Sequence, residues 1–191
     1  MRSVNGALSI VRLDRRGQTK AQTTNGPLDI SPVCSSDGRL LYYADYKPPA
    51  GIRRCGPEGC RTLLGEQVAE LALSPDDKRL AFVTVGTRGP VVHWIGTEGG
   101  QVHEVTETET GCAPGWSSNQ TLWVSRRRGK DAIWTEVDAD SGRTTGKIVH
   151  GARECADGES DPSSPVSPDI RAVADRRSEL RLLPTRYLPT E

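Results

Sequence analysis

A short polar turn sequence returns four times along the chain, each time followed by a short apolar run. All copies begin with serine and carry Asp or Asn at the third position: Ser35-Ser36-Asp37-Gly38, Ser74-Pro75-Asp76-Asp77, Ser117-Ser118-Asn119-Gln120 and Ser167-Pro168-Asp169-Ile170. The copies start roughly 40–50 residues apart, the period of repeats built from short strands and turns. The repeat therefore predicts an all-β fold, a β-propeller of four-stranded antiparallel blades.

Alternating apolar and polar residues predict three complete blades with partial blades at both ends. Strands are expected at 28–35, 39–45, 51–55 and 60–64, at 68–74, 79–85, 90–96 and 101–106, and at 112–117, 121–126, 132–138 and 144–150. The N-terminal partial blade is expected at 8–13 and 18–23, and the C-terminal one at 163–167, 170–175 and 179–183. A helix over 66–73 is conceivable, but the repeat register favours a strand.

These strands predict a single propeller domain over residues 1–191. Its blade repeats are expected at about 28–66, 67–107, 111–151 and 161–185, after a partial blade at 7–24. Propellers normally close, because closure hides the open faces of the first and last blades. The N-terminal strands could complete the last blade of a small four-bladed ring. The incomplete ends favour the alternative, an open arc from a larger ring.

The charge of the chain argues against partners held by long-range electrostatics. Lys plus Arg and Asp plus Glu are both 25, so the formal net charge is zero. This disfavours nucleic acid and anionic membranes as partners. No apolar run approaches the ~18–20 residues that span a bilayer. Residues 1–25 do not resemble a secretory signal, which predicts a cytoplasmic chain by default and an extracytoplasmic one if it is part of a longer envelope protein.

Five cysteines, at positions 34, 55, 60, 112 and 155, form no obvious disulfide framework. Cys55 and Cys60 flank a Gly-Pro-Glu-Gly turn, which would bring them opposite each other in a hairpin. Two reduced thiols, a disulfide and a metal site all remain open for this pair. A metal is the least favoured, because no second Cys or His pair with zinc spacing accompanies it.

We find no motif for catalysis, for a cofactor or for a metal. There is no Gly-x-Ser-x-Gly nucleophile turn, no His-x-x-x-His, no EF-hand loop and no phosphate-binding glycine loop. The Asp residues of the repeated turn are expected to be structural, since Asp after Ser accepts local backbone hydrogen bonds. The sequence therefore predicts a chain that is not an enzyme.

Two regions are candidates for partner binding. Trp123 and Trp134 lie near a basic run, Arg126, Arg127 and Arg128. Core packing between blades and a solvated loop are the plain interpretations of these residues, and a binding hot spot is the sharper one. A long polar insertion before the last repeat, which includes Asp157 and Glu159, is the first choice for a contact surface, because such loops carry specificity.

The second repeat resembles the WD40-like PD40 repeats of the TolB family. The matching residues are Leu73-Ser74-Pro75-Asp76-Asp77-Lys78-Arg79-Leu80-Ala81-Phe82, Val92-His93-Trp94-Ile95, Gly99-Gly100 and Val105-Thr106. The first and third repeats depart by having Ser36 and Ser118 in place of Pro. Similar repeats form extracytoplasmic domains of bacterial receptor-like Ser/Thr kinases and non-catalytic propellers of serine peptidases.

The resemblance implies a non-catalytic binding or scaffold module, part of a larger bacterial sensor or envelope protein. The expected partner is a protein or peptide, with no nucleic acid, no direct membrane insertion and no cofactor. The chain could also assemble with missing blades or with another chain. The alternative is an accessory propeller that positions substrate for a peptidase or kinase domain outside this chain.

Overall fold

The computed structural model describes residues 2–4, 7–13, 19–22, 29–87, 89–108, 112–128, 131–150, 170–175 and 179–184. In this part of the chain every regular element is a β-strand and none is a helix. Accordingly, no helix among the described residues is long and apolar enough to cross a membrane.

Three antiparallel sheets of four consecutive strands form the main body. Blade 1 contains β5 (Asp29–Cys34), β6 (Leu41–Asp45), β7 (Gly51–Gly56) and β8 (Gly59–Leu64). Blade 2 contains β9 (Ala69–Leu73), β10 (Arg79–Gly86), β11 (Gly89–Gly96) and β12 (His103–Glu107). Blade 3 contains β13 (Gly115–Trp116), β14 (Thr121–Arg128), β15 (Asp131–Asp138) and β16 (Thr144–His150). The predicted all-β class and the three complete blades are confirmed.

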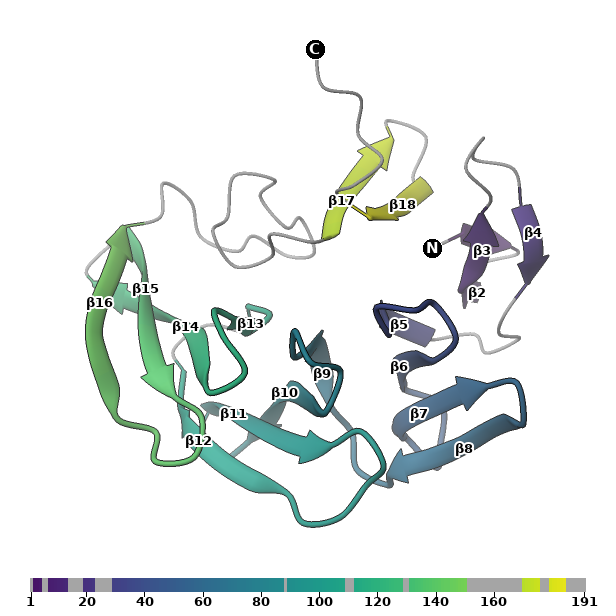
Figure 1. Cartoon of the computed structure of the whole chain (residues 1–191). Coiled ribbons are helices and arrows are strands. Elements are labelled where there is room, and N and C mark those ends of the chain that lie inside the picture. The colour runs from purple at the N-terminus through teal and green to yellow at the C-terminus, as the bar shows by residue number, and fades with distance from the viewer. Residues whose placement is uncertain are drawn as a thin grey trace.

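The blades fan out side by side, as Figure 1 shows. The first strands of the blades (β5, β9 and β13) lie next to one another on the inner side of the fan. The last strands (β8, β12 and β16) lie on its outer side. This is the radial arrangement of a propeller, in which each blade packs face to face on the next.

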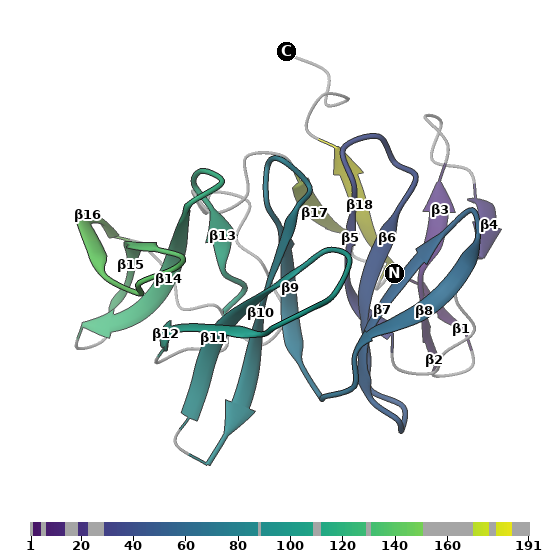
Figure 2. The same cartoon turned by 60° about the horizontal axis from the view of Figure 1, so that its bottom comes forward.

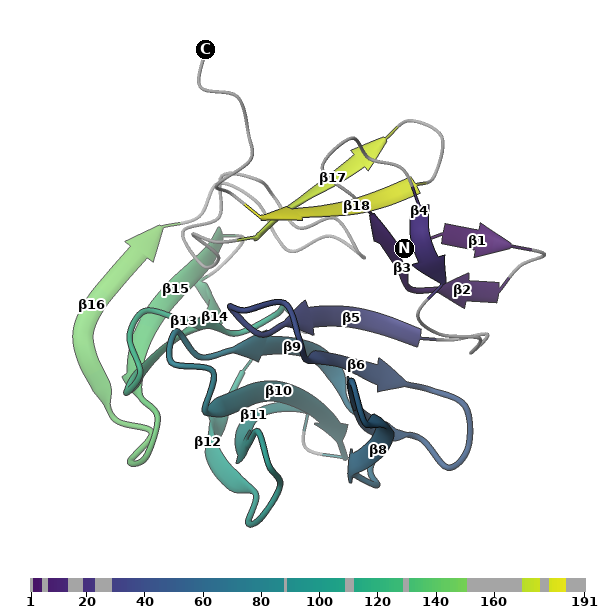
Figure 3. The same ribbon diagram turned by 45° about the vertical axis from the view of Figure 1, so that its right-hand side comes forward.

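The ends form hairpins of two strands. They are β1 (Arg2–Val4) with β2 (Ala7–Ser9), β3 (Val11–Leu13) with β4 (Thr19–Gln22), and β17 (Ile170–Asp175) with β18 (Glu179–Pro184). Strand β1 lies beside β18 (Figure 3), yet they belong to separate sheets. The described strands thus leave the fan unclosed. The predicted strand at 163–167 lies outside the described residues.

The single strand predicted over 8–13 is wrong. The chain changes partner at Ile10, so that β2 pairs with β1 and β3 pairs with β4. The Ile10 side chain is buried beside Tyr43 and Cys55 of blade 1. Strand β1 has no counterpart among the predicted strands.

The core lies between the blades. Because side chains of a strand alternate between faces, Leu80 and Phe82 of β10 pack toward blade 1 while Ala81 and Val83 pack toward blade 3. All four are fully buried. One apolar cluster thus joins blades 1 and 2, and a second joins blades 2 and 3.

Strands occupy two segments whose conformation the sequence left open. Residues 66–73 do not form the conceivable helix, because strand β9 occupies Ala69–Leu73. The basic run Arg126–Arg128 is not a loop, because β14 stays paired with β15 out to the Arg128–Asp131 pair. The continuous β14–β15 pairing satisfies the backbone hydrogen bonds of these residues. The run of charged side chains gave no indication of this pairing.

Candidate functional site

The turns that connect the first to the second strand and the third to the fourth strand of each blade share one face, which we term the turn face. Thr97 of the β11–β12 turn donates from its backbone N–H to the Lys78 carbonyl, and Ala139 of the β15–β16 turn donates to that of Gln120. Figure 2 shows the β5–β6, β9–β10 and β13–β14 turns together at one end of the blades, with the β6–β7 connection at the opposite end.

The repeated Ser-x-Asp turn is built by its own side chains. In blade 1, Ser35 Oγ donates to Asp37 Oδ1 at 2.6 Å, and the Arg39 backbone N–H donates to the same oxygen at 2.9 Å. These bonds lower the pKa of Asp37, the serine hydroxyl more than the backbone. Gly38 completes the turn at φ +69°, a conformation that glycine adopts without strain. The expected structural role of Asp37 is therefore confirmed.

Blades 2 and 3 build the same turn with different residues. Ser74 Oγ donates to Asp76 Oδ1 at 2.7 Å, and this bond is the main cause of the lowered pKa of Asp76. Asp77, in the place of Gly38, adopts φ +59°. In blade 3, Ser118 Oγ accepts from the backbone N–H groups of Gln120 and Thr121 at 3.1 Å. A serine hydroxyl thus takes the place of the Asp carboxylate in this turn, which has Asn119 at the third position.

Neighbouring turns are also bonded to each other across the blades. Asp77 Oδ2 accepts from the backbone N–H of Ser36 at 2.9 Å and from its hydroxyl at 2.5 Å. Asn119 Oδ1 accepts from the backbone N–H of Asp76 at 3.1 Å. These bonds connect the three inner turns into one continuous polar rim.

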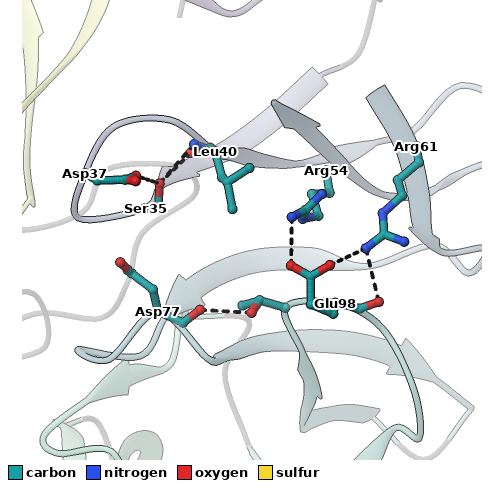
Figure 4. A network of polar contacts seen from close by, with 8 residues as sticks. Ser35, Asp37, Leu40, Arg54, Arg61, Asp77 and Glu98 are labelled. Atoms are coloured by element: carbon teal, nitrogen blue, oxygen red, sulfur yellow. Dashed lines mark hydrogen bonds and ion pairs between the residues drawn. The ribbon is translucent and has the colours of Figure 1, made fainter. Parts of the chain in front are cut away.

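A second polar contact joins blades 1 and 2 farther out on the turn face (Figure 4). Glu98, in the β11–β12 turn, accepts from Nη2 of Arg54 and from Nη2 of Arg61, both at 2.7 Å. Arg54 lies on β7 and Arg61 lies opposite it on β8. Sequence reasoning missed this contact, since it assigned the Glu98 segment to a hairpin turn and saw no link to arginines some 40 residues away.

The inner strands of blades 1 and 2 carry a matching bulge. Ser31 and Glu70 each lie four residues before the repeated serine, and both adopt positive φ, +50° and +48°. Both sit where the register with the next strand shifts. Ser31 Oγ donates to Glu70 Oε2 at 3.2 Å, and burial raises the pKa of Glu70. Non-glycine residues at positive φ are uncommon, and no pattern in the sequence indicated them.

Trp123 and Trp134 lie together on blade 3, on the face turned away from blade 2. They form a cluster with Cys112 and Val149, in which Trp134 is buried and Trp123 is half-buried. Glu136 is buried on the same face and accepts from Thr145 Oγ1 at 2.6 Å. This hydroxyl is the first cause of the lowered pKa of Glu136, and the Lys147 ammonium adds to it.

Arg126 of the basic run does not join the tryptophans. Arg126 lies on the opposite face of β14, where its Nη2 donates to Thr106 Oγ1 of blade 2 at 3.1 Å. Arg127 and Arg128 pair through their backbones with Ala132 and Asp131. The other two candidate contact residues, Asp157 and Glu159, lie outside the described residues.

Cys55 and Cys60 form a disulfide across the β7–β8 hairpin, with their Cα atoms 4.0 Å apart. Of the three states left open by the sequence, the structure has the oxidised one. Cys112 is also disulfide-bonded. The described residues contain no group of three or more His, Cys, Asp or Glu side chains that could hold a metal ion. What the turn face offers is hydrogen-bonding and ionic contacts displayed on a rigid scaffold.

Solved structures with the same fold include propellers of different roles. TolB from Acinetobacter baumannii matches with a TM-score of 0.66 at 22% identity, over 80% of this chain and 40% of that one. A nidogen/laminin complex matches with a TM-score of 0.55 at 12% identity, over 78% and 60%. An acylaminoacyl peptidase matches with a TM-score of 0.51 at 12% identity, over 64% and 25%.

The chain thus spans less than half the length of the TolB structure that it matches. A comparison with curated proteins gives no match. At the sequence level, the model of the lipoprotein LpqB β-propeller domain matches residues 58–182. These residues include most of the strands of the three blades, and the TolB-like propeller repeat proposed from the sequence is confirmed. The chain belongs to the LpqB β-propeller domain family.

Proposed function

We propose that the chain is a non-catalytic propeller module that binds a protein or peptide partner through its turn face, as part of a larger bacterial sensor or envelope protein. The observation that carries the proposal is the continuous polar rim made by Ser36, Asp77, Asp76 and Asn119. Each turn is braced both internally and by its neighbour, so its outward groups are displayed with little conformational freedom. Binding to a preorganised surface loses less entropy.

Other features fit this proposal. One structure with the same fold comes from a complex of two proteins, nidogen and laminin. Cys55 and Cys60 form a disulfide and Cys112 is also disulfide-bonded, which suits an oxidising compartment. Additional partner contacts remain predicted at Trp123, Trp134, Arg126, Arg127, Arg128, Asp157 and Glu159. The single domain over 1–191 and its blade boundaries also remain predictions.

Site-specific cross-linking tests the proposal. A photoactivatable residue is placed at Gln120, exposed in the β13–β14 turn on the turn face, and in a second variant at Ile148, which is 53% exposed on the outer strand β16. Each variant is irradiated in an extract of the source organism. We expect a discrete protein adduct from position 120 that is absent from position 148. Equal adducts from both positions, or none from either, would contradict the proposal.

The second candidate is an accessory propeller that positions substrate for a catalytic domain outside this chain. The likeness to the acylaminoacyl peptidase favours it. A hydrolase or kinase domain encoded in frame with this chain would support it. In that case the adduct from position 120 would be with that domain or its substrate.

A further inference from the structure

We propose that Arg54 and Arg61 form a receptor for carboxylates of an acidic segment of the partner, and that Glu98 fills this receptor when the partner is absent. The inference rests on the proposed function, since it names the chemistry of the partner that the turn face binds. It starts from the placement of two guanidinium groups on one hairpin.

Arg54 and Arg61 are direct cross-strand partners in the β7–β8 ladder. Like charges directly opposite each other destabilise an antiparallel pair. The next pair in the same ladder is Cys55 with Cys60, whose disulfide prevents the strands from slipping and separating the charges. The hairpin therefore holds two cations together at a place where only an anion between them relieves the repulsion.

Glu98 is the anion, but it supplies one negative charge for two positive ones. Its carboxylate receives one Nη2 from each arginine at 2.7 Å, and its backbone carbonyl accepts a further bond from Arg61 at 3.2 Å. Arg54 Nε is buried, and the Arg54 side chain also makes a hydrogen bond with Tyr42. A guanidinium can bind a carboxylate through two parallel N–H groups, so the contact with Glu98 leaves binding capacity unused on Arg61, the more exposed of the two arginines.

The contact is also easy to exchange. The Glu98 side chain is 72% exposed and that of Arg61 is 51% exposed, whereas that of Arg54 is only 21% exposed. Ion pairs between exposed groups contribute little. Glu98 lies in a turn followed by Gly99 and Gly100, both at positive φ. The arginines are thus fixed in the sheet, and their counter-ion is on the part of the contact that solvent reaches.

Fluorescence anisotropy with two labelled peptides tests the inference on the purified chain. One peptide alternates Glu with Gly, and the other alternates Gln with Gly. At low salt we expect the Glu peptide to bind more tightly than the Gln peptide. Glu98→Gln should tighten Glu-peptide binding by about fivefold, the upper range for losing an exposed competing ion pair. Arg61→Gln should weaken it by about tenfold, as expected for a lost charge-assisted hydrogen bond.

Two matched variants control for net charge. Glu58→Gln removes an exposed carboxylate from the β7–β8 turn of the same face, and Arg143→Gln removes an exposed cation from the β15–β16 turn. Both should leave the affinity unchanged. Thermal unfolding checks that each variant is folded, and Arg61→Lys replaces Arg61→Gln if the latter is not.

The inference is overturned if both peptides bind equally, if Glu98→Gln does not tighten binding, or if Glu58→Gln tightens it as much. A partner cross-linked at position 120 without any preference for the Glu peptide would refute this inference and leave the proposed function standing. Preference for the Glu peptide without any cross-linked partner would support the carboxylate receptor and count against the proposed function.

Discussion

The two boundaries between blades solve the same packing problem with different chemistry. Both have an apolar interior, but the boundary of blades 1 and 2 is completed by ionisable groups, Glu70 with Ser31 at the inner side and Glu98 with two arginines farther out. The boundary of blades 2 and 3 is completed largely by tryptophans. Trp116 and Trp94 donate from Nε1 to the Ala72 and Ala139 carbonyls, both at 3.0 Å.

This difference predicts which boundary responds to pH and salt. An indole N–H bonded to a carbonyl does not titrate. Carboxylate contacts respond to pH and to salt. We therefore expect blades 1 and 2 to form the responsive boundary and blades 2 and 3 the constant one. Even at the second boundary one exposed pair, Arg79 with Asp140 at 3.0 Å, covers Trp94.

Removing apolar volume should have the largest effect and should act at both boundaries alike. Phe82→Ala empties part of the cluster of blades 1 and 2, and we expect a loss of about 3–5 kcal/mol in the free energy of unfolding. Val124→Ala at the other boundary removes less volume and should cost less. Urea unfolding followed by tryptophan fluorescence measures both. A change below about 1 kcal/mol for Phe82→Ala would show that these clusters do not hold the blades together.

Trp116→Phe at the boundary of blades 2 and 3 should lower the free energy of unfolding by a smaller amount. The substitution keeps an aromatic ring but leaves the Ala72 carbonyl without its indole donor, which costs about 1–3 kcal/mol when the acceptor stays buried. Val105→Ala serves as a packing control, since Val105 belongs to the same cluster and makes no side-chain hydrogen bond. We expect the loss caused by Trp116→Phe to be the same at high and low salt. A strong salt dependence would show that the substitution removes an ionic contact and not only the indole hydrogen bond.

Glu70→Gln should sharpen the comparison by removing the pH response. Because burial raises the pKa of Glu70 in the folded chain, the wild type loses stability as the pH rises from the ordinary glutamate pKa through the folded one. Gln keeps an oxygen for the Ser31 hydroxyl and carries no charge. The variant should therefore be more stable than the wild type at neutral pH, with a gain that shrinks as the pH falls toward 4.5, the ordinary value. Unfolding measured at several pH values checks this, and a gain independent of pH would refute it.

Glu98→Gln should have the smallest effect on folding, at most about 1 kcal/mol, because the Glu98 carboxylate is largely exposed. The loss should disappear in high salt. Asp140→Asn is the matched change at the other boundary, where Asp140 is 58% exposed. Thermal unfolding at two salt concentrations compares them. A larger, salt-independent loss would mean that Glu98 holds the blades rigidly and is not an exchangeable counter-ion.

The repeat allowed most of the blade architecture to be predicted, because a strand and a turn are specified by neighbouring residues. The Ser-x-Asp turn shows this directly, since Ser35, Asp37 and Arg39 bond within five residues of one another. The N-terminal strands were predicted less well. There the break at Ile10 is accompanied by burial of its side chain with Tyr43 and Cys55, which lie far away along the chain.

Which of the candidate residues share one face could not be read from the sequence for the same reason. Trp123 and Trp134 do lie together, but Arg126 points to the other face of its strand. Moving by one residue along a strand places the side chain on the opposite face. Proximity in sequence therefore does not show that two side chains share a face. Glu98 and Glu70 were missed because their partners belong to another blade.

By itself the sequence determined the repeat, the strands and the turns that connect them, because these depend on interactions over a few residues. The tertiary structure alone decided which polar groups meet across the blades: Ser36 with Asp77, Ser31 with Glu70, and Glu98 with Arg54 and Arg61. Such contacts depend on how one sheet is stacked on the next. That stacking is set by the summed packing of the buried side chains, which no local pattern encodes.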